Sequence, residues 1–315
     1  MRALRFDGQR IQVQNVAEPE VCEDSVLVNV SLAGICNTDL EIVRGYMGFQ
    51  GTLGHEFVGT VEQGPAELRG QRVVGEINFA CRNCPVCHQG LQRHCPSRTV
   101  MGIHDADGAF AERVRVPVAN LHPVPDAVAD ELAVFTEPLA AAFEILEQVH
   151  IEPGRECIVL GDGKLGLLVA QVLHHAGARV VCVGKHREKL AILAKRDIET
   201  LLLDDWRGEP VSLVVEATGT AEGFERAIAV LRPRGTLVLK STVAEQLSVD
   251  LSPLVIDEIQ VVGSRCGPFP PALRALELGA VDVRSLITDR VPLSRGTEAL
   301  ERANAPGALK VLIEV

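Results

Sequence analysis

The sequence predicts an α/β protein of two domains, a β-rich domain followed by a doubly wound parallel sheet. Two patterns along the 315 residues carry this prediction. The first third holds short runs of alternating polarity separated by glycines, which is typical of an antiparallel, barrel-like β unit. From about Pro138, strands that are nearly all apolar alternate with helices, which indicates a parallel sheet covered on both faces.

The expected elements follow that order. Strands are predicted at 26–34, 57–64, 71–77 and 110–116, and then at 157–160, 179–183, 201–203, 211–217, 235–239 and 259–263. Helices are predicted at 165–176, 187–195 and 221–231. The tail from about Pro270 holds a helix and a last strand, 309–315, and we place it back on the first domain. The predicted domains are therefore 1–138 with 269–315, and 139–268.

The composition excludes two classes of partner. A net charge of −11 repels nucleic acid and anionic membranes, and 3% aromatic residues leave little surface for stacking bases. No apolar run reaches the length of about 18 residues that spans a membrane, and the first residues lack the apolar core of a signal peptide. We therefore expect a cytoplasmic protein, whose nine cysteines are metal ligands or buried thiols rather than disulfides.

The strongest local signal is a set of closely spaced cysteines, Cys81, Cys84, Cys87 and Cys95. Two CxxC steps and a fourth thiol can converge on one tetrahedral ion, and four thiolates leave no open position for substrate. The pattern predicts a structural zinc in a lobe at about 80–96. The plainer alternative is a chance cluster of buried cysteines. Haem c attachment at Cys84–His88 is rejected, because it leaves two cysteines unexplained and needs an exported protein.

A glycine motif follows the predicted strand 157–160 and opens the next helix. The residues expected to hold a dinucleotide there are Gly161, Gly163, Lys164, Leu165 and Gly166. The first glycine permits a tight turn, the second lets the backbone approach a pyrophosphate, and the third allows close helix packing. The free N–H groups of the helix N-terminus then face the phosphates. The strand–turn–helix context makes this motif specific, although GxGxxG alone is weak.

The end of the next strand distinguishes the two nicotinamide cofactors. NAD enzymes usually place Asp or Glu there for the adenosine 2′-hydroxyl. This chain has Gly184 instead, followed by Lys185, His186 and Arg187. Cationic donors without a carboxylate suit a 2′-phosphate, so the sequence favours NADP over NAD. A solvated basic helix start is the alternative, and Gly184→Asp is expected to shift preference towards NAD.

A third, scattered group consists of Cys36, His55, Glu56 and Glu137, in the segments GICNTD, GHEFVG and TEPLAA. Taken singly, Cys36, His55 and Glu137 each have a plainer interpretation. The cysteine could be a small buried residue, the histidine a satisfied core histidine, and Glu137 a solvated carboxylate at a helix start. The order in which these segments occur along the chain, however, favours a shared functional role over these plainer interpretations.

The order GICNTD, GHEFVG, four cysteines, EPLA, GxGxxG and VVEATG resembles the zinc-containing medium-chain alcohol dehydrogenase family, in its polyol, threonine and archaeal glucose dehydrogenase branch. The resemblance covers essentially the whole chain. It implies a GroES-like catalytic domain and a Rossmann coenzyme domain. It also implies two zinc ions per chain, one catalytic and one structural. A homodimer or homotetramer is expected.

The resemblance also implies roles for single residues. Cys36 and His55 match catalytic-zinc ligands, Glu137 matches the third ligand in this branch, and Glu56 is an adjacent or exchangeable ligand. Such a set leaves one position for water or substrate.

Around these ligands, Asp39 matches the carboxylate that orients the zinc-bound histidine. Thr38 matches the residue that relays the substrate proton. Thr218, in VVEATG, is expected to contact the cofactor. Glu41 stands where many relatives have His, so the proton exit route stays open.

The implied reaction is hydride transfer between a secondary alcohol, polyol or sugar hydroxyl and NADP, with zinc lowering the pKa of the hydroxyl. Three alternatives are an NAD-dependent threonine- or sorbitol-type dehydrogenase, a non-catalytic NADP-binding protein, and a zinc-free quinone or enoyl reductase. The last would lack the zinc ligands that this chain has. Four residues are candidates for the substrate pocket by their proximity to the ligands: Tyr46, Phe49, Ile103 and His104.

Overall fold

A computed structural model describes residues 1–241 and 248–315. These residues form two compact units, the first made of 1–137, 272–278 and 286–315 and the second of 138–271 and 279–285. The short segment 279–285 groups with the second unit, because Gln171 accepts a hydrogen bond from the Asp282 amide (2.6 Å) and donates one to its carbonyl (3.1 Å). The predicted boundary instead assigns that segment to the first domain.

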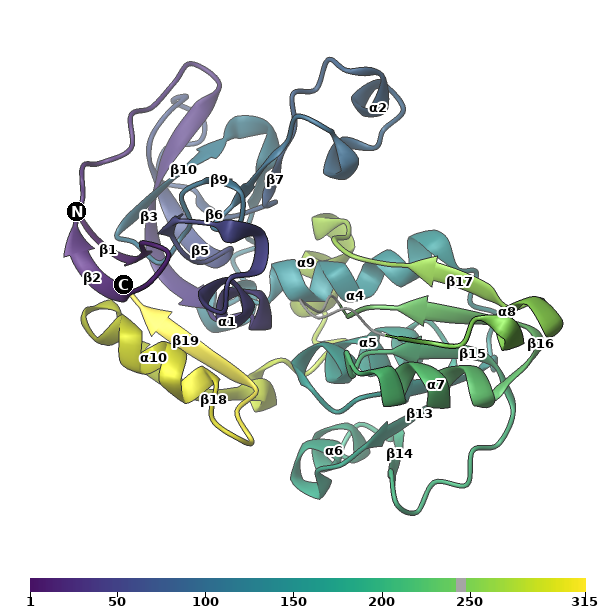
Figure 1. Ribbon diagram of the computed structural model, residues 1–315. Coiled ribbons are helices and arrows are strands. Elements are labelled where there is room, and N and C mark those ends of the chain that lie inside the picture. The colour runs from purple at the N-terminus through teal and green to yellow at the C-terminus, as the bar shows by residue number, and fades with distance from the viewer. Residues whose placement is uncertain (242–247) are drawn as a thin grey trace. The chain divides into compact units, whose positions relative to one another are not determined.

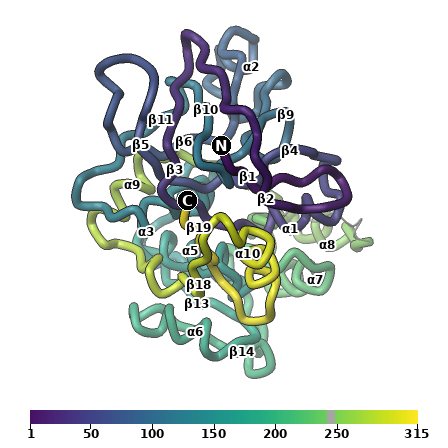
Figure 2. The backbone as a smooth tube through the Cα atoms, turned by 90° about the vertical axis from the view of Figure 1, so that its left-hand side faces the viewer, coloured from purple at the N-terminus to yellow at the C-terminus, as the bar shows by residue number. Residues whose placement is uncertain are grey.

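The first unit is built on a largely antiparallel sheet with the strand order β11-β6-β5-β3-β19-β18, and β10 also pairs with β3. The strands are β3 (Ser25–Gly34), β5 (Glu56–Gln63), β6 (Arg72–Gly75), β10 (Arg113–Pro117), β11 (Leu121–Pro123), β18 (Ile287–Pro292) and β19 (Lys310–Glu314). Because β19 pairs antiparallel with β3, the C-terminal strand lies among the N-terminal ones (Figures 1 and 2). Its inward side chains, such as Leu312, are fully buried.

Smaller elements complete the first unit. One set of short strands is β1 (Arg2–Phe6), β2 (Ile11–Asn15) and β4 (Gly51–Thr52), and another is β7 (Asn78–Phe79), β8 (Thr99–Met101) and β9 (Asp105–Ala106). The helices are α1 (Asn37–Val43), α2 (Pro85–His88), α3 (Asp130–Ala133), α9 (Phe269–Glu277) and α10 (Gly296–Ala303), with the α9 start in the second unit. The loop that carries α2 extends away from the strands of this unit (Figure 1).

The second unit holds a parallel sheet with the order β14-β13-β12-β15-β16-β17. The strands are β12 (Glu156–Leu160), β13 (Arg179–Gly184), β14 (Glu199–Leu202), β15 (Val211–Glu216), β16 (Leu231–Leu239) and β17 (Gln260–Gly263). Every neighbouring pair is parallel. The order reverses beside β12, which is the arrangement of a dinucleotide-binding Rossmann fold.

Helices cover this sheet. They are α4 (Thr136–Gln148), α5 (Lys164–His175), α6 (Arg187–Ala194), α7 (Ala221–Ala229) and α8 (Ser252–Ile256). Helix α5 packs on β12 and β13, α6 on β13 and β14, and α7 on β15 and β16. The strand interiors are apolar on both faces for this reason, and Ile158, Val214 and Leu237 share one buried cluster. Within the described ranges, no helix is both long and apolar enough to cross a membrane.

Candidate metal centres and cofactor site

Cys36, His55 and Glu56 form one metal-competent group in the first unit. Their ligand atoms all lie within 4.8 Å of one another. Two neighbouring strands bring them together, because Gly34 near the end of β3 pairs with Glu56 at the start of β5. Cys36 follows β3 as the N-cap of α1, and His55 directly precedes β5. The sheet register therefore unites residues from two sequence motifs.

Asp39 holds two of these residues in place. Its side chain is fully buried. One carboxylate oxygen accepts the Cys36 amide (2.8 Å), and the other lies 3.3 Å from His55 Nδ1 and accepts the Gly54 amide at the same distance. Burial acts to lower the pKa of His55, but the Asp39 carboxylate and then Cys36 outweigh it, so the pKa lies well above its ordinary value. A carboxylate beside one ring nitrogen is the usual partner of a histidine whose other ring nitrogen binds a metal.

Glu56 is held from the opposite side by Lys310. The ion pair between Glu56 Oε2 and Lys310 Nζ is almost completely buried. Lys310 Nζ also lies 3.4 Å from the Ile35 carbonyl oxygen and 5.5 Å from the centre of the Phe135 ring. A Cβ on Gly34 would stand 2.5 Å from Glu56 Oε2, so only glycine leaves room for this carboxylate.

The remaining oxygen of this carboxylate fits a metal. Glu56 Oε1 is buried and has no hydrogen-bond partner among the described residues, which is costly for an isolated oxygen. A thiolate, an imidazole and a carboxylate are the donor types that zinc takes in three-ligand sites. The chemistry and spacing of the group therefore suit a zinc ion with one open position.

Three other predicted residues of this region are Thr38, Glu41 and Glu137. Thr38 Oγ1 lies 3.6 Å from Cys36 Sγ, and Glu41 accepts a 2.6 Å hydrogen bond from Arg44. Glu137, in the first turn of α4, stands outside the metal-competent group within the described residues. Its assignment as a ligand stays a prediction.

The four candidates for the substrate pocket differ in how deeply they are buried. Phe49 is buried, with its ring against Gly51, as expected of a core residue. Tyr46 and Ile103 are partly buried, and His104 is exposed with its ring 3.5 Å from the Asp105 carboxylate. Their role in a substrate pocket stays a prediction.

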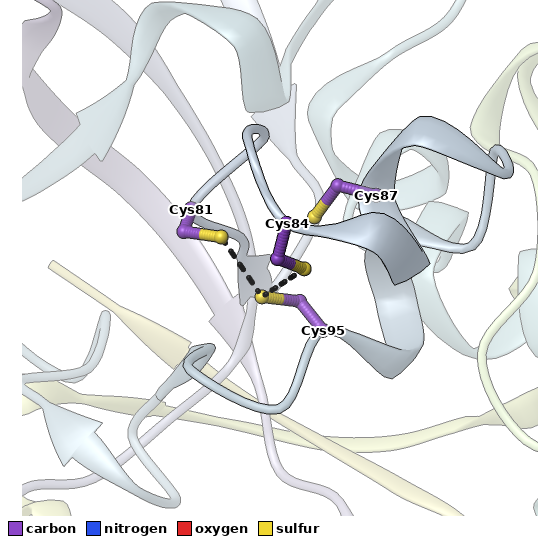
Figure 3. A group of neighbouring side chains, drawn as sticks. All are labelled: Cys81, Cys84, Cys87 and Cys95. Atoms are coloured by element: carbon purple, nitrogen blue, oxygen red, sulfur yellow. Dashed lines mark hydrogen bonds between the residues drawn. The ribbon is translucent and has the colours of Figure 1, made fainter.

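The four lobe cysteines converge on a common centre. Their sulfur atoms lie within 4.8 Å of one another, and Figure 3 shows them pointing inward from the loop around α2. Cys84 caps α2, and Cys95 follows the short 3₁₀ turn Gln92–His94. Gly90 (φ 79°) takes the left-handed conformation that the reversal between them needs.

The sulfur spacing matches a tetrahedral ion rather than disulfides. Cys95 Sγ lies 3.5 Å from Cys81 Sγ and 3.9 Å from Cys84 Sγ. Four thiolates at the usual Zn–S length of about 2.3 Å stand about 3.8 Å apart, whereas a disulfide measures about 2.05 Å. The Asn83 amide, followed by Cys95, lowers the pKa of Cys81 to about 7, which favours the thiolate form there.

The glycine turn of the second unit lines a cavity of about 250 Å³ at the carboxyl ends of β12, β13 and β15. Gly161 (φ 118°) makes the tight turn, and a Cβ on Gly166 would meet the Gly161 carbonyl oxygen at 2.1 Å. At Gly163 a Cβ would meet nothing within 4 Å, so this position faces open space. The turn thus leaves room for a pyrophosphate where the motif predicts one.

Two carboxylates shape the rim of this cavity. Glu216, buried at the end of β15, accepts the Thr218 amide (2.6 Å), the Thr218 hydroxyl and the Gly219 amide (3.0 Å). Asp162 accepts the amides of Lys185 (2.7 Å) and His186 (2.6 Å). Neither carboxylate was predicted from the sequence. Asp162 holds a turn more than twenty residues further along the chain, whereas Glu216 holds the loop that directly follows its own strand.

The predicted cofactor residues surround the same cavity. Gly161, Gly163, Gly184, Lys185 and Thr218 all line it. The side chains of Lys185, His186 and Arg187 are exposed beside it. Lys164 and Leu165 open α5, and Gly166 packs against the turn.

Known proteins resemble this chain over its whole length. Residues 22–126 match the alcohol dehydrogenase GroES-like domain and residues 165–278 the zinc-binding dehydrogenase domain. D-arabinitol dehydrogenase 1 of Uromyces fabae is 29% identical over an alignment of 340 residues, covering 100% of this chain and 97% of that protein. Sorbitol dehydrogenase of Halalkalibacterium halodurans is 29% identical over 325 residues, covering 96% and 94%.

Solved structures also resemble this chain over its whole length. A chain described as a zinc-binding dehydrogenase from Sinorhizobium meliloti 1021, bound to NADP, has a TM-score of 0.90 at 29% identity and covers 100% and 99% of the two chains. Alcohol dehydrogenase TADH from Thermus sp. ATN1 has a TM-score of 0.90 at 28% identity, covering 100% of both. The chain belongs to the zinc-containing medium-chain alcohol dehydrogenase family and is a dehydrogenase built from a GroES-like domain and a Rossmann domain.

Proposed function

We propose that this enzyme uses zinc and NADP to oxidise a secondary hydroxyl of a polyol or sugar, or to reduce the corresponding carbonyl. The convergence of Cys36, His55 and Glu56, with one carboxylate oxygen left unpartnered, carries the proposal. A second zinc would be held by the four lobe cysteines and would stabilise that loop. Glu137 is the proposed additional or exchanging carboxylate of the catalytic site.

Zinc bound in the first site would supply the positive charge that acidifies a hydroxyl or polarises a carbonyl. The residues of the chain orient the ligands and transfer the proton. Asp39 orients His55 and anchors Cys36 through its amide. Thr38, whose Oγ1 lies 3.6 Å from Cys36 Sγ, would accept the substrate hydroxyl proton while it passes its own proton on. Glu41, on the same helix and paired with Arg44, is the proposed group for passing that proton to solvent.

The choice of NADP rests on the end of β13. Gly184 removes the carboxylate that usually binds a ribose hydroxyl, and the exposed cations Lys185 and Arg187 follow it. The NADP held by the Sinorhizobium protein supports the same choice. The relatives named for arabinitol and sorbitol support a polyol substrate.

The test is reduction of NADP, and separately of NAD, by the purified protein with polyols, sugars, 3-hydroxy amino acids and simple alcohols, before and after chelation. We expect turnover of a polyol or sugar with NADP that chelation removes. Cys36→Ala should abolish turnover and lower the zinc content from two ions to one, whereas Cys22→Ala should change neither. Normal turnover by Cys36→Ala would refute the metal assignment. NADPH binding without turnover of any substrate would favour the non-catalytic alternative.

A further inference from the structure

Asp162 links the glycine turn to the turn that follows β13. It is 7% exposed. Its Oδ2 accepts the backbone amides of Lys185 and His186, and His186 Nδ1 lies 3.0 Å from the same oxygen. The glycine turn and the turn after β13, which both line the proposed cofactor cavity, are thus joined through one carboxylate.

This carboxylate fills the space where the strand-end acid of an NAD enzyme would begin. A Cβ on Gly184 would lie 2.5 Å from both Asp162 Cβ and Oδ2. Gly184 lacks a positive φ, so contact with Asp162 rather than backbone conformation requires glycine there. The single change Gly184→Asp, expected from the sequence to shift preference towards NAD, therefore meets a steric obstacle.

We infer that Asp162 is a positioning residue that determines the choice between phosphorylated and unphosphorylated cofactor, and this inference rests on the proposed function. Its carboxylate accepts two backbone amides and contacts the His186 ring, so it does not serve a ribose hydroxyl. With those two amides occupied, the exposed side chains of Lys185, His186 and Arg187 are the proposed donors to a 2′-phosphate. Asp162 holds the turn that presents them, and its contact with His186 Nδ1 leaves Nε2 free to face the phosphate.

The test measures the dissociation constants of NADPH and NADH by fluorescence titration, with no substrate present. We expect Asp162→Ala to weaken NADPH about tenfold, the effect of losing hydrogen bonds to a charged group, and to change NADH much less. Asp162→Asn, which keeps an oxygen for the two amides, should retain most of the NADPH affinity. Glu152→Ala removes an exposed carboxylate elsewhere in the second unit and should change neither constant.

A double variant that moves the carboxylate from position 162 to position 184 gives a sharper test. Asp162→Gly combined with Gly184→Asp frees the space and moves the acid to the strand end, so this double variant should bind NADH more tightly than NADPH. Gly184→Asp alone should weaken both cofactors. An unchanged NADPH-to-NADH ratio in Asp162→Ala, or a single Gly184→Asp variant that switches preference as well as the double variant, would overturn the inference alone. Failure of the wild type to bind either cofactor would overturn the proposed function with it.

Discussion

Glu56 and Lys310 form a buried ion pair between the strand that follows the histidine motif and the C-terminal strand of the chain. Both side chains are at most 1% exposed. The pair leaves the other Glu56 oxygen buried without a hydrogen-bond partner, in a carboxylate that belongs to the metal-competent group with Cys36 and His55. The tail of the chain therefore takes part in the proposed catalytic centre without contributing a ligand.

Breaking this pair should cost much stability. Lys310→Met leaves the Glu56 carboxylate buried without a counter-charge, so we expect a loss of about 3–5 kcal/mol in the free energy of unfolding. Urea denaturation of the metal-free protein measures it. The double variant Glu56→Gln/Lys310→Met removes both charges and should recover part of the loss. A loss below about 1 kcal/mol in the single variant would show that the pair is solvated.

The third ligand of the catalytic zinc can be assigned by two matched variants. A carboxylate oxygen of Glu56 lies within 4.8 Å of the ligand atoms of Cys36 and His55, whereas Glu137 stands outside their group in the described chain. We therefore expect Glu56→Gln to weaken zinc binding at this site more than Glu137→Gln does. Zinc competition with a chromogenic chelator measures both affinities. The reverse order would assign the third ligand to Glu137.

Alanine substitutions at two glycines of the cofactor turn should change different properties: folding stability at Gly166 and NADPH binding at Gly163. Gly166→Ala places a methyl group 2.1 Å from a backbone oxygen, so it should lower the free energy of unfolding by about 2 kcal/mol or more. Gly163→Ala meets no protein atom within 4 Å and should fold normally, yet it should block NADPH. Denaturation and NADPH titration separate the two effects. NADPH binding of wild-type strength by Gly163→Ala would move the pyrophosphate elsewhere.

The cysteine lobe should hold its metal independently of the first site. Cys95→Ser removes a buried ligand from the four-sulfur centre, so the protein should lose one zinc ion and its loop should become sensitive to proteolysis. Metal analysis and the cleavage sites on mass spectra check this. Cys157→Ser, on a buried strand outside both groups, is the control for a lost cysteine. Two zinc ions retained by Cys95→Ser would contradict the four-thiolate site.

The open edge of the parallel sheet is the expected interface between copies. Strand β17 ends the sheet order among the described strands and carries Val261, which is 43% exposed. Val255 and Ile256, at the end of the preceding helix α8, are 79% and 76% exposed. An unpaired apolar edge favours two-fold pairing with a second chain. Ile256→Glu should lower the mass in solution measured by light scattering, whereas Leu278→Glu, at an exposed site of the first unit, should not. An unchanged mass would exclude this edge.

Much of the fold is present in local patterns. The apolar strands around the glycine motif all lie within a few residues of their predicted bounds, as do β3 and β5. The predicted elements omit several that the structure has, among them strands β1 and β2 and helices α1, α4 and α10. Strands β1 and β2 are short and mixed in polarity, so they depend on partners elsewhere in the chain. Strand β2, for example, is mostly exposed and depends on its pairing with β1.

The sequence by itself determined the family, the two kinds of domain and the residue types of each candidate site, because motif spacing and apolar periodicity are properties of neighbouring residues. Only the tertiary structure decided which distant groups meet. It set Lys310 against Glu56 and placed Asp162 where a Gly184 side chain would go. Such contacts depend on strand register and on turns packed across a sheet, which no local pattern records.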